Sequence, residues 1–306
     1  MSEFDVYLYG VMVNSTLYTI HTPFPGPDGY AEISKVQPNI GGEAVGSAMV
    51  LARLGLRCLL DGNWLGDSEN GRWLRETVRQ RGVDVSLLTI PEGYPGPVEV
   101  VISDNNSRTI FGQYVDLLFT HRQWNIPRKE DVGRASLACI DPFFHAESRL
   151  CVQYAMELGI PYVMIDCKAD DELARNPLAI IVSGEYRNRE HPGKDMDELF
   201  TWYQNTVPGL VIFTAGGERV IYGRKGGPVQ TYKPYPIQPV DTAGAGDSFR
   251  AGVVYGLLQG WEDEQIIRYS SALAGLVCLS SPGVMNGPTH QEVLDFIKQN
   301  GDEWNV

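Results

Sequence analysis

Apolar runs and amphipathic segments alternate along most of the chain, and this pattern predicts alternating strands and helices. In the segment 67–84, for example, Trp73, Leu74 and Val78 recur at helical spacing and Gly82 is typical of a helix end. Strands are expected at 5–13, 56–66, 137–141, 161–166, 178–182, 209–215 and 219–223, and helices at 41–55, 67–84, 146–159, 196–206, 245–259, 262–280 and 291–299. Such alternation indicates a mostly parallel sheet with helices on both faces.

Two segments depart from this alternation. The segment 14–38 is rich in Pro, Gly and Thr, and 87–114 alternates apolar and polar residues as strands do. Asp104, Asn105 and Asn106 are typical of a hairpin turn between two such runs. We interpret both segments as a small β-sheet lid inserted into one α/β domain. The assignment is 1–13, 39–86 and 115–306 for the α/β domain, and 14–38 and 87–114 for the lid.

Composition and charge narrow the class of protein. The chain has 306 residues, of which 43% are hydrophobic and 21% are charged, as in an ordinary globular protein. Its net charge is −13 and it has no long basic stripe, so we expect no nucleic-acid partner. A small anion remains a possible ligand, because a few local donors suffice to bind it.

The location of the protein is predicted from its apolar runs and its cysteines. No apolar run approaches the roughly 20 residues that cross a bilayer, and the first residues are unlike a secretory signal. The five cysteines are scattered and form no CxxC pair. We therefore expect a soluble protein of the reducing cytoplasm, without a membrane partner.

The stretch DTAGAGDSF, residues 241–249, is the main candidate for chemistry. It is not a Walker A motif, and Phe249 occupies the third glycine position of a dinucleotide fingerprint. Gly244, Ala245 and Gly246 begin an apolar helix, whose first amide groups can bind an anion. Asp247 would lie beside that anion as a general base for an attacking hydroxyl. The alternative is that Asp247 only complements the helix dipole.

The same stretch resembles the C-terminal signature of the ribokinase-like (PfkB) carbohydrate kinases. Further stretches resemble the family in the expected order: GGEAVGSAMVLARLG, LGDSENGRWLRETVRQRGVD, TAGGERVIYG and SSPGVMNGPTHQEV. The resemblance implies a three-layer α/β ribokinase-like fold with a small β-sheet lid, and an ATP- and Mg²⁺-dependent kinase. It implies that Asp247 is the general base and that Gly244, Ala245 and Gly246 form the anion hole.

The resemblance also assigns roles to residues elsewhere in the chain. The substrate-binding candidates are Asn14, Gly41, Gly42 and Arg108. Arg250 is added to them not from the resemblance but from its position three residues after Asp247, on roughly the same helical face. The nucleotide-binding candidates are Thr214, Gly216 and Gly283. The metal candidates are Glu185, which would hold Mg²⁺ through water, and Asp241, which would help to hold a monovalent cation such as K⁺.

Several positions depart from the family pattern. Asn14 stands where the first strand of the family ends in aspartate, and Gly46 stands where an asparagine is usual. Ser183 replaces the asparagine of the magnesium motif, and Glu185 comes one residue early. Glu43 stands where some sugar kinases have lysine, which makes a strongly anionic sugar phosphate a poorer candidate substrate.

Arg250 and Arg219 each have more than one interpretation. Arg250 either lowers the pKa of Asp247, binds an acidic group of the acceptor, or extends its head into solvent. Arg219 either reaches a nucleotide phosphate or lies in solvent. Asp141 and Asp166 lie at the C-terminal ends of predicted strands, where α/β sheets collect ligands, and we expect both to be structural or supporting acids.

We expect the protein to phosphorylate a hydroxyl, in the first instance a primary one, of a sugar or sugar-like molecule. One alternative is a nucleoside kinase, because the lid is rich in aromatic residues that stack on bases: Tyr18, Phe24, Tyr30, Tyr94, Phe111 and Tyr114. Another is a catalytically weak metabolite-binding protein, because Asn14, Gly46 and Ser183 depart from the pattern. The alternating lid strands would also allow a homodimer through the lid.

Overall fold

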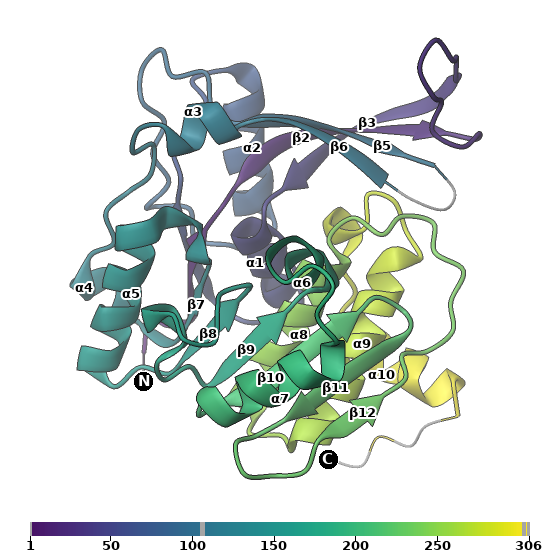
Figure 1. The fold of residues 1–306 in the computed structure, drawn as a ribbon. Coiled ribbons are helices and arrows are strands. Elements are labelled where there is room, and N and C mark those ends of the chain that lie inside the picture. Colours follow the sequence, from purple (N-terminus) through teal and green to yellow (C-terminus); the bar gives the residue numbers. More distant parts are fainter. Residues whose placement is uncertain (1, 105–107, 302–303, 305–306) are drawn as a thin grey trace.

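The computed structural model describes residues 2–104, 108–301 and 304. Two sheets are found in this part of the chain, and helices lie on both faces of the larger one (Figure 1). The expected architecture is therefore confirmed. Asn105 and Asn106 of the expected hairpin turn lie outside the described residues.

The larger sheet has the strand order β12-β11-β10-β9-β8-β7-β1-β4 in the described chain. Its strands are β1 (Phe4–Gly10), β4 (Cys58–Gly62), β7 (Ala135–Ile140), β8 (Tyr162–Ile165), β9 (Ala179–Val182), β10 (Leu210–Ala215), β11 (Arg219–Gly223) and β12 (Gln230–Tyr232). All neighbours from β4 to β10 are parallel, and β11 and β12 are antiparallel additions. The chain proceeds from β1 to β4 on one side and from β7 to β10 on the other, so its order reverses between β1 and β7.

Both faces of this sheet are covered, which explains why its strands are apolar throughout. In β1, Val6 and Leu8 belong to one buried cluster, while Tyr7 and Tyr9 belong to the other. The first face packs against α1 (Glu43–Arg53), α2 (Glu69–Gln80), α8 (Ala245–Gln259), α9 (Asp263–Cys278) and α10 (His290–Gln299). The second packs against α4 (Lys129–Val132), α5 (His145–Leu158), α6 (Gly184–Glu190) and α7 (Met196–Thr206).

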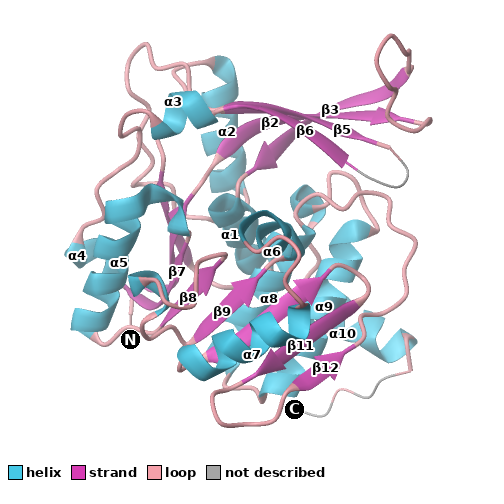
Figure 2. Cartoon of the chain, in the orientation of Figure 1, coloured by secondary structure: helices cyan, strands magenta, loops and turns pink. Residues whose placement is uncertain are grey.

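The smaller sheet has the order β3-β2-β5-β6 and stands apart from the larger one (Figure 2). Its strands are β2 (Val13–Ile20), β3 (Ile33–Gly41), β5 (Val98–Ser103) and β6 (Arg108–Gln113), followed by α3 (Val115–Phe119). Three short 3₁₀ helices complete the described elements: η1 (Pro142–Phe144), η2 (Glu172–Ala174) and η3 (Val284–Asn286).

The two faces of the small sheet differ in burial. Ser15, Leu17 and Val101 are almost fully buried, so their face points toward the rest of the molecule. The register pairs Ser15 with Glu99 and Val101 with Ile110, so Glu99 shares this inner face. Residues of the opposite parity form the outer face, because successive side chains of a strand alternate.

One sequence-based expectation needs correction. The apolar run 5–13 was expected to be one strand, but β1 ends at Gly10 and β2 begins at Val13 in the other sheet. A continuous apolar run does not reveal the break, since both strands bury their side chains. The short elements α3, α4, α6 and β12 were not expected, because three to seven residues are too few to show a period.

The described helices include none that is both long and apolar enough to cross a membrane. All five cysteines are unpaired and buried.

Candidate functional site

The loop before α8 is shaped by Gly244. This residue caps the helix with φ 78°, in the left-handed region that favours glycine. A Cβ atom on Gly244 would lie 1.7 Å from Cγ2 of Val284, so a larger residue does not fit. A Cβ atom on Gly246 would meet no atom within 4 Å, and the space beside the first helical turn is therefore open.

The amide groups at this helix start are available to an anion. The N–H of Ala245 makes a long turn contact of 3.3 Å with the carbonyl of Thr242, and the first regular helical bond is donated by Ser248 to Gly244 O. The first amides of a helix lack partners within the helix, and the helix dipole adds positive potential there. The arrangement is that of an anion site with Gly246 at its open side.

Asp247 lies in the first turn of α8, with its carboxyl group partly buried at the edge of this anion site. Burial raises the pKa of Asp247 to about 7. Arg250 and Arg108 lower this pKa, whereas Asp141 and Glu99 raise it further. A carboxyl group with a pKa near neutrality is suited to accept a proton from a hydroxyl group.

Gly46 of α1 faces the carboxyl group of Asp247. A Cβ atom on Gly46 would lie 2.8 Å from Oδ2 and 3.0 Å from Cβ of Asp247. Gly46, one of the residues that depart from the family pattern, therefore makes room for the carboxyl group of the predicted base.

The glycine pair before α1 also makes room for its neighbours. A Cβ atom on Gly41 would lie 2.2 Å from Oε1 of Glu99 on the small sheet. Gly42 has φ 104°, and a Cβ atom on it would lie 2.3 Å from the carbonyl oxygen of Val11. The pair thus lets the start of α1 approach both β5 and the end of β1.

Several acids surround this part of the site. Burial raises the pKa of Glu43 to about 8, and the neighbouring Asp141 and Asp247 contribute to the shift. Burial also raises the pKa of Glu99, which Ser15 and Arg108 lower. Burial is the largest cause that raises the pKa of Tyr114. The negative charges of Glu99, Glu43 and Glu185 raise this pKa further. These groups therefore lie around one space between the small sheet, α1 and α6.

The small sheet reaches the anion loop directly. Nη1 of Arg108 donates to the carbonyl of Thr242 at 2.7 Å, and Nε2 of Gln37 donates to Oγ of Ser281 at 3.3 Å. Asn14 differs, because its Nδ2 donates to the carbonyl of Asn70 in α2 at 3.1 Å. Asn14 precedes the inward-facing Ser15 in β2, so it belongs to the outer face of the small sheet. Its role in substrate binding stays a prediction.

Asp241 is buried under the same loop. Its Oδ1 accepts from the amide of Ala243 at 2.9 Å and its Oδ2 from Oγ of Ser281 at 3.2 Å. Gly283 lies against this loop, since a Cβ atom there would be 3.2 Å from the carbonyl of Ala243. Both oxygens of Asp241 thus already stabilise the loop, and a monovalent cation would have to share them.

Ser183, Asp166 and Glu185 lie at the start of α6. The two oxygens of Asp166 accept from the amide and the hydroxyl of Ser183 at 2.7 and 2.8 Å, and Ser183 caps α6 by accepting from Tyr186 N at 3.0 Å. Asp166 therefore supports the helix start, as expected of a structural acid. Glu185 is exposed in the first turn of this helix.

The described residues contain no group of three or more His, Cys, Asp or Glu side chains arranged to hold a metal ion. One carboxylate with water and phosphate oxygens is nevertheless the usual environment of Mg²⁺ beside a nucleotide. Glu185 fits that requirement.

Thr214 and Gly216 lie at the end of β10 and in the turn that follows it. The carbonyl of Thr214 is near Gly184 of α6, at 3.4 Å from a Cβ atom placed there. Gly216 has φ 54° and open space beside it. Arg219 pairs with Asp197 at 3.1 Å on the exposed surface, so its head is held by α7.

Arg250 does not extend into solvent, and that interpretation is wrong. The side chain is 1% exposed, and its guanidinium pairs with Asp141, which is fully buried after β7. The expectation of a structural role for Asp141 agrees with this contact. Direct binding of an acceptor by Arg250 stays a prediction.

Sequence reasoning missed Ser15, Ser47 and Glu99. Ser47 bonds to residues 200 and 203 positions away, and Glu99 meets Gly41 from another sheet. Their neighbours in the sequence carry no signal for these contacts. The one available signal was the alternation of β5, which puts Glu99 on the same face as Val101.

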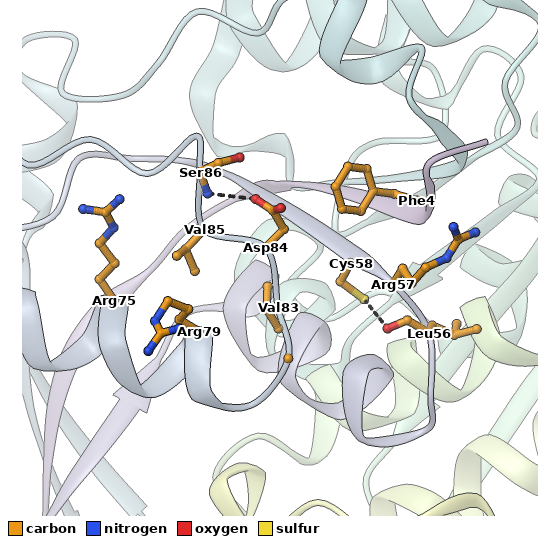
Figure 3. Close-up of a pocket in the computed structure, with 11 residues that line it drawn as sticks. Phe4, Leu56, Arg57, Cys58, Arg75, Arg79, Val83, Asp84, Val85 and Ser86 are labelled. Atoms are coloured by element: carbon orange, nitrogen blue, oxygen red, sulfur yellow. Dashed lines mark hydrogen bonds between the residues drawn. The ribbon is translucent and has the colours of Figure 1, made fainter.

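Two surface grooves lie elsewhere. Figure 3 shows one of about 550 Å³ beside β4 and α2, lined among others by Arg57 and Arg79. These two side chains pair with Asp5 and Glu76. A second groove, of about 910 Å³, lies between the ends of α1, α2, α9 and α10. Neither is lined by a candidate site residue.

Comparisons with known proteins find relatives of this chain among carbohydrate and nucleoside kinases. The family model described as "pfkB family carbohydrate kinase" matches residues 184–289. The chain is 28% identical over 298 residues to a nucleoside kinase of Methanothermobacter thermautotrophicus, covering 94% of each chain. It is 26% identical over 291 residues to an ATP-dependent ribose-1-phosphate kinase of Halopiger xanaduensis, covering 91% of this chain and 93% of that protein.

A solved structure shows the same fold. The Arabidopsis thaliana ribokinase complexed with ribose and ATP superposes with a TM-score of 0.78 at 18% identity. The superposition covers 97% of this chain and 99% of that one.

Proposed function

Because the chain belongs to the ribokinase-like (PfkB) family of carbohydrate kinases, we propose that it transfers the γ-phosphoryl group of ATP to a hydroxyl group of a sugar or sugar-like molecule. The observation that carries the proposal is the position of Asp247. Its carboxyl group has a pKa of about 7 and lies in the first turn of α8, beside the open anion site at Gly246.

The geometry gives each group of the site a chemical task. Asp247 accepts the proton of the acceptor hydroxyl as that oxygen attacks, because a hydroxyl is a weak nucleophile while it keeps its proton. The amides of residues 244–246 stabilise the negative charge of the transferred group. Arg108, through its contact with Thr242 O, holds the small sheet over the loop and limits the access of water.

The nucleotide and metal residues are proposals of the same kind. ATP with Mg²⁺, when bound, supplies the phosphoryl group and neutralises phosphate charge. Thr214, Gly216 and Gly283 would border the nucleotide, and Glu185 would orient the waters of Mg²⁺. Asp241 would contribute to a K⁺ site, although it already accepts two hydrogen bonds.

The acceptor side favours hydroxyl-rich, uncharged molecules over strongly anionic ones. Glu43, Glu99 and Asp247 approach the same space. Arg108 acts on Glu99 and Asp247 there, and Arg250 acts on Glu43 and Asp247. Carboxylates accept hydrogen bonds from the hydroxyl groups of a polyol.

A nucleoside is the second candidate acceptor, since one relative is a nucleoside kinase. Of the lid aromatics, Tyr114 lies beside Glu43 and Glu99 and is the one placed to contact a base. Tyr18 and Phe111 have the parity of the outer face of the small sheet, and Phe24 is 6.1 Å from Phe111 between ring centroids. A sugar therefore remains our first proposal, and a non-catalytic binding protein is disfavoured by the intact anion site.

A substrate panel tests the proposal. Formation of ADP is measured with ATP and Mg²⁺, with and without K⁺, for sugars, sugar acids, ribose 1-phosphate, and purine and pyrimidine nucleosides. We expect turnover with at least one acceptor, and a loss of about a thousandfold in Asp247→Asn, which keeps the size of the side chain but not its basicity. ATP binding should be retained in this variant.

Two outcomes would contradict the proposal. Wild-type turnover in Asp247→Asn would exclude this carboxyl group as the base. An acceptor that raises the melting temperature, in a panel that gives no ADP, would favour the metabolite-binding protein.

We also propose that the protein works in a reducing, cytoplasmic environment and pairs with a second copy through the outer face of the small sheet. The unpaired, buried state of all five cysteines supports the first point. Exposed apolar residues on the small sheet, among them Val36 and Phe111, support the second.

A further inference from the structure

Arg250 occupies the point where the strand order of the large sheet reverses. Its Nη1 bonds to Oδ1 of Asp141, which directly follows β7. The other oxygen of Asp141 accepts from the amide of Val11, which directly follows β1, at 3.0 Å. Because β1 and β7 are the neighbours between which the order reverses, the ion pair lies at the crevice where sheets of this class bind ligands.

The same guanidinium reaches the predicted base through one hydroxyl group. Nε of Arg250 donates to Oγ of Ser47 in α1 at 2.8 Å. Oγ of Ser47 donates in turn to the carbonyl oxygen of Asp247 at 3.0 Å. A continuous path of contacts therefore runs from the ends of β1 and β7 through Arg250 and Ser47 to the main chain of Asp247.

The rest of the surroundings makes this arrangement rigid. The carbonyl of Asp141 accepts from Oγ of Ser148 at 2.7 Å, and a Cβ atom on Gly10 would lie 1.8 Å from Oδ2 of Asp141. The carboxyl group thus has one position available to it.

Stability alone does not account for the pair. Removing two charges from water is costly, and apolar residues of similar volume are often as stable or more so. Within the described residues, Nη2 of Arg250 is also buried without a hydrogen-bond partner, which adds a desolvation cost. A costly arrangement beside the base is expected when the charge and its position serve the reaction.

We propose that Arg250 is a positioning residue of the phosphoryl-transfer site, which holds the first turn of α8 through Ser47 and Asp141 and sets a positive charge on the helix that carries Asp247. This inference rests on the proposed function of Asp247 as the base. It gives Arg250 a task other than contact with the acceptor.

The charged groups that face Asp247 come from five directions. Arg250 lies on its own helix, Arg108 on β6, Glu99 on β5 and Asp141 after β7, while Glu43 on α1 interacts with it from the glycine pair. After burial, Arg250 has the largest influence on the pKa of Asp247 and lowers it, whereas Asp141 raises it. The two members of the ion pair therefore act on the base in opposite directions.

The test compares Arg250→Met with Asp141→Asn. We expect the acidic limb of kcat/KM to move up by about one pH unit in Arg250→Met and down in Asp141→Asn. In Arg250→Met we also expect kcat to fall about tenfold or more, with KM for ATP changed less than about twofold. Arg250→Lys keeps the charge but not both contacts, so its acidic limb should stay near that of the wild type while kcat falls.

Two controls keep the test decisive. Arg224→Met removes a surface pair with Asp263 and should leave the pH profile unchanged. Because Arg250→Met leaves Asp141 unpaired and can fail to fold, Arg250→Met/Asp141→Asn is measured beside it, with a thermal melt. We expect a smaller upward movement of the acidic limb in this double variant.

A second readout requires no acceptor. Carboxyl ¹³C NMR follows the pKa of Asp247 directly in each folded variant, so it tests this inference even if the substrate panel gives no product. An unchanged pKa in Arg250→Met and in the double variant, or shifts of the same sign in Arg250→Met and Asp141→Asn, would overturn the proposal and leave Arg250 a structural residue.

Discussion

Three glycines in the site each leave room for one carboxyl group. A Cβ atom on Gly10 would lie 1.8 Å from Asp141 Oδ2, and one on Gly41 would lie 2.2 Å from Glu99 Oε1. A Cβ atom on Gly46 would lie 2.8 Å from Asp247 Oδ2. At the residue scale, the acids are thus placed by the absence of neighbouring side chains as well as by contacts.

Gly46→Ala tests this directly. The added methyl group would displace the carboxyl group of Asp247, so we expect kcat to fall about tenfold or more. We expect no matching loss in the free energy of unfolding, because alanine is more favourable than glycine in a helix interior by about 1 kcal/mol. Steady-state kinetics and a thermal melt measure both.

Gly275→Ala in α9 is the matched control, because a Cβ atom there would meet neighbours only at 3.9 and 4.0 Å. It makes the same exchange in a helix without touching Asp247. Equal kinetics in the two variants would contradict the steric role of Gly46.

The pH dependence of turnover follows from the pKa of Asp247. The base works in its ionised form, so activity should be low below its pKa and rise with pH through about 7. The measurement is kcat/KM for the acceptor between about pH 5 and pH 9. An acidic limb near pH 4 would show that burial does not raise the pKa of Asp247 to about 7.

At the element scale, the start of α6 depends on one hydroxyl group. Ser183 caps the helix through Tyr186 N and donates to Asp166. Glu185, the proposed Mg²⁺ residue, lies in the first turn of the same helix. The cap therefore fixes the helix turn that carries this carboxylate.

Ser183→Ala should lower the free energy of unfolding by about 1 kcal/mol, as the loss of a helix cap does. We further expect a higher Mg²⁺ concentration for half-maximal activity, because the first turn of α6 loses its fixed position. A Mg²⁺ titration at saturating ATP measures this effect.

Thr289→Ala is the control, because Thr289 caps α10 through Glu292 N at 3.3 Å and lies in another part of the fold. It should lower stability by a similar amount and leave the Mg²⁺ dependence unchanged. An unchanged Mg²⁺ requirement in both variants would separate Glu185 from metal binding.

At the scale of the whole molecule, the outer face of the small sheet carries exposed apolar side chains. The register pairs Val36 with Tyr18 and Val100 with Phe111, all of the outer parity. Val36 is 56% exposed and Phe111 52% exposed. A second copy of the chain would cover this surface.

Val36→Glu should therefore convert a dimer into a monomer, because a charge cannot be buried unpaired between two sheets. Light scattering coupled to size-exclusion chromatography measures the mass. Ile126→Glu, at a position 54% exposed outside the small sheet, should leave the mass unchanged. A monomeric wild type at all concentrations would refute pairing through this face.

Local patterns in the sequence determined the alternating elements, the extra lid strands and the glycine-rich start of α8. Each of these depends on the period of apolar residues or on the backbone needs of a turn, which neighbours in the chain express. The motif DTAGAGDSF likewise predicted that Asp247 and Gly244–Gly246 lie at the start of one helix.

Only the tertiary structure decided which residues meet. It divided the run 5–13 between two sheets, placed Ser47 between Arg250 and Asp247, and brought Glu99 of β5 against Gly41. These contacts join positions up to 203 residues apart, and their energies depend on burial that no local pattern encodes. For this reason the sequence offered an influence of Arg250 on Asp247 as one interpretation, whereas the direction of the Arg250 side chain and its partner Asp141 were not visible there.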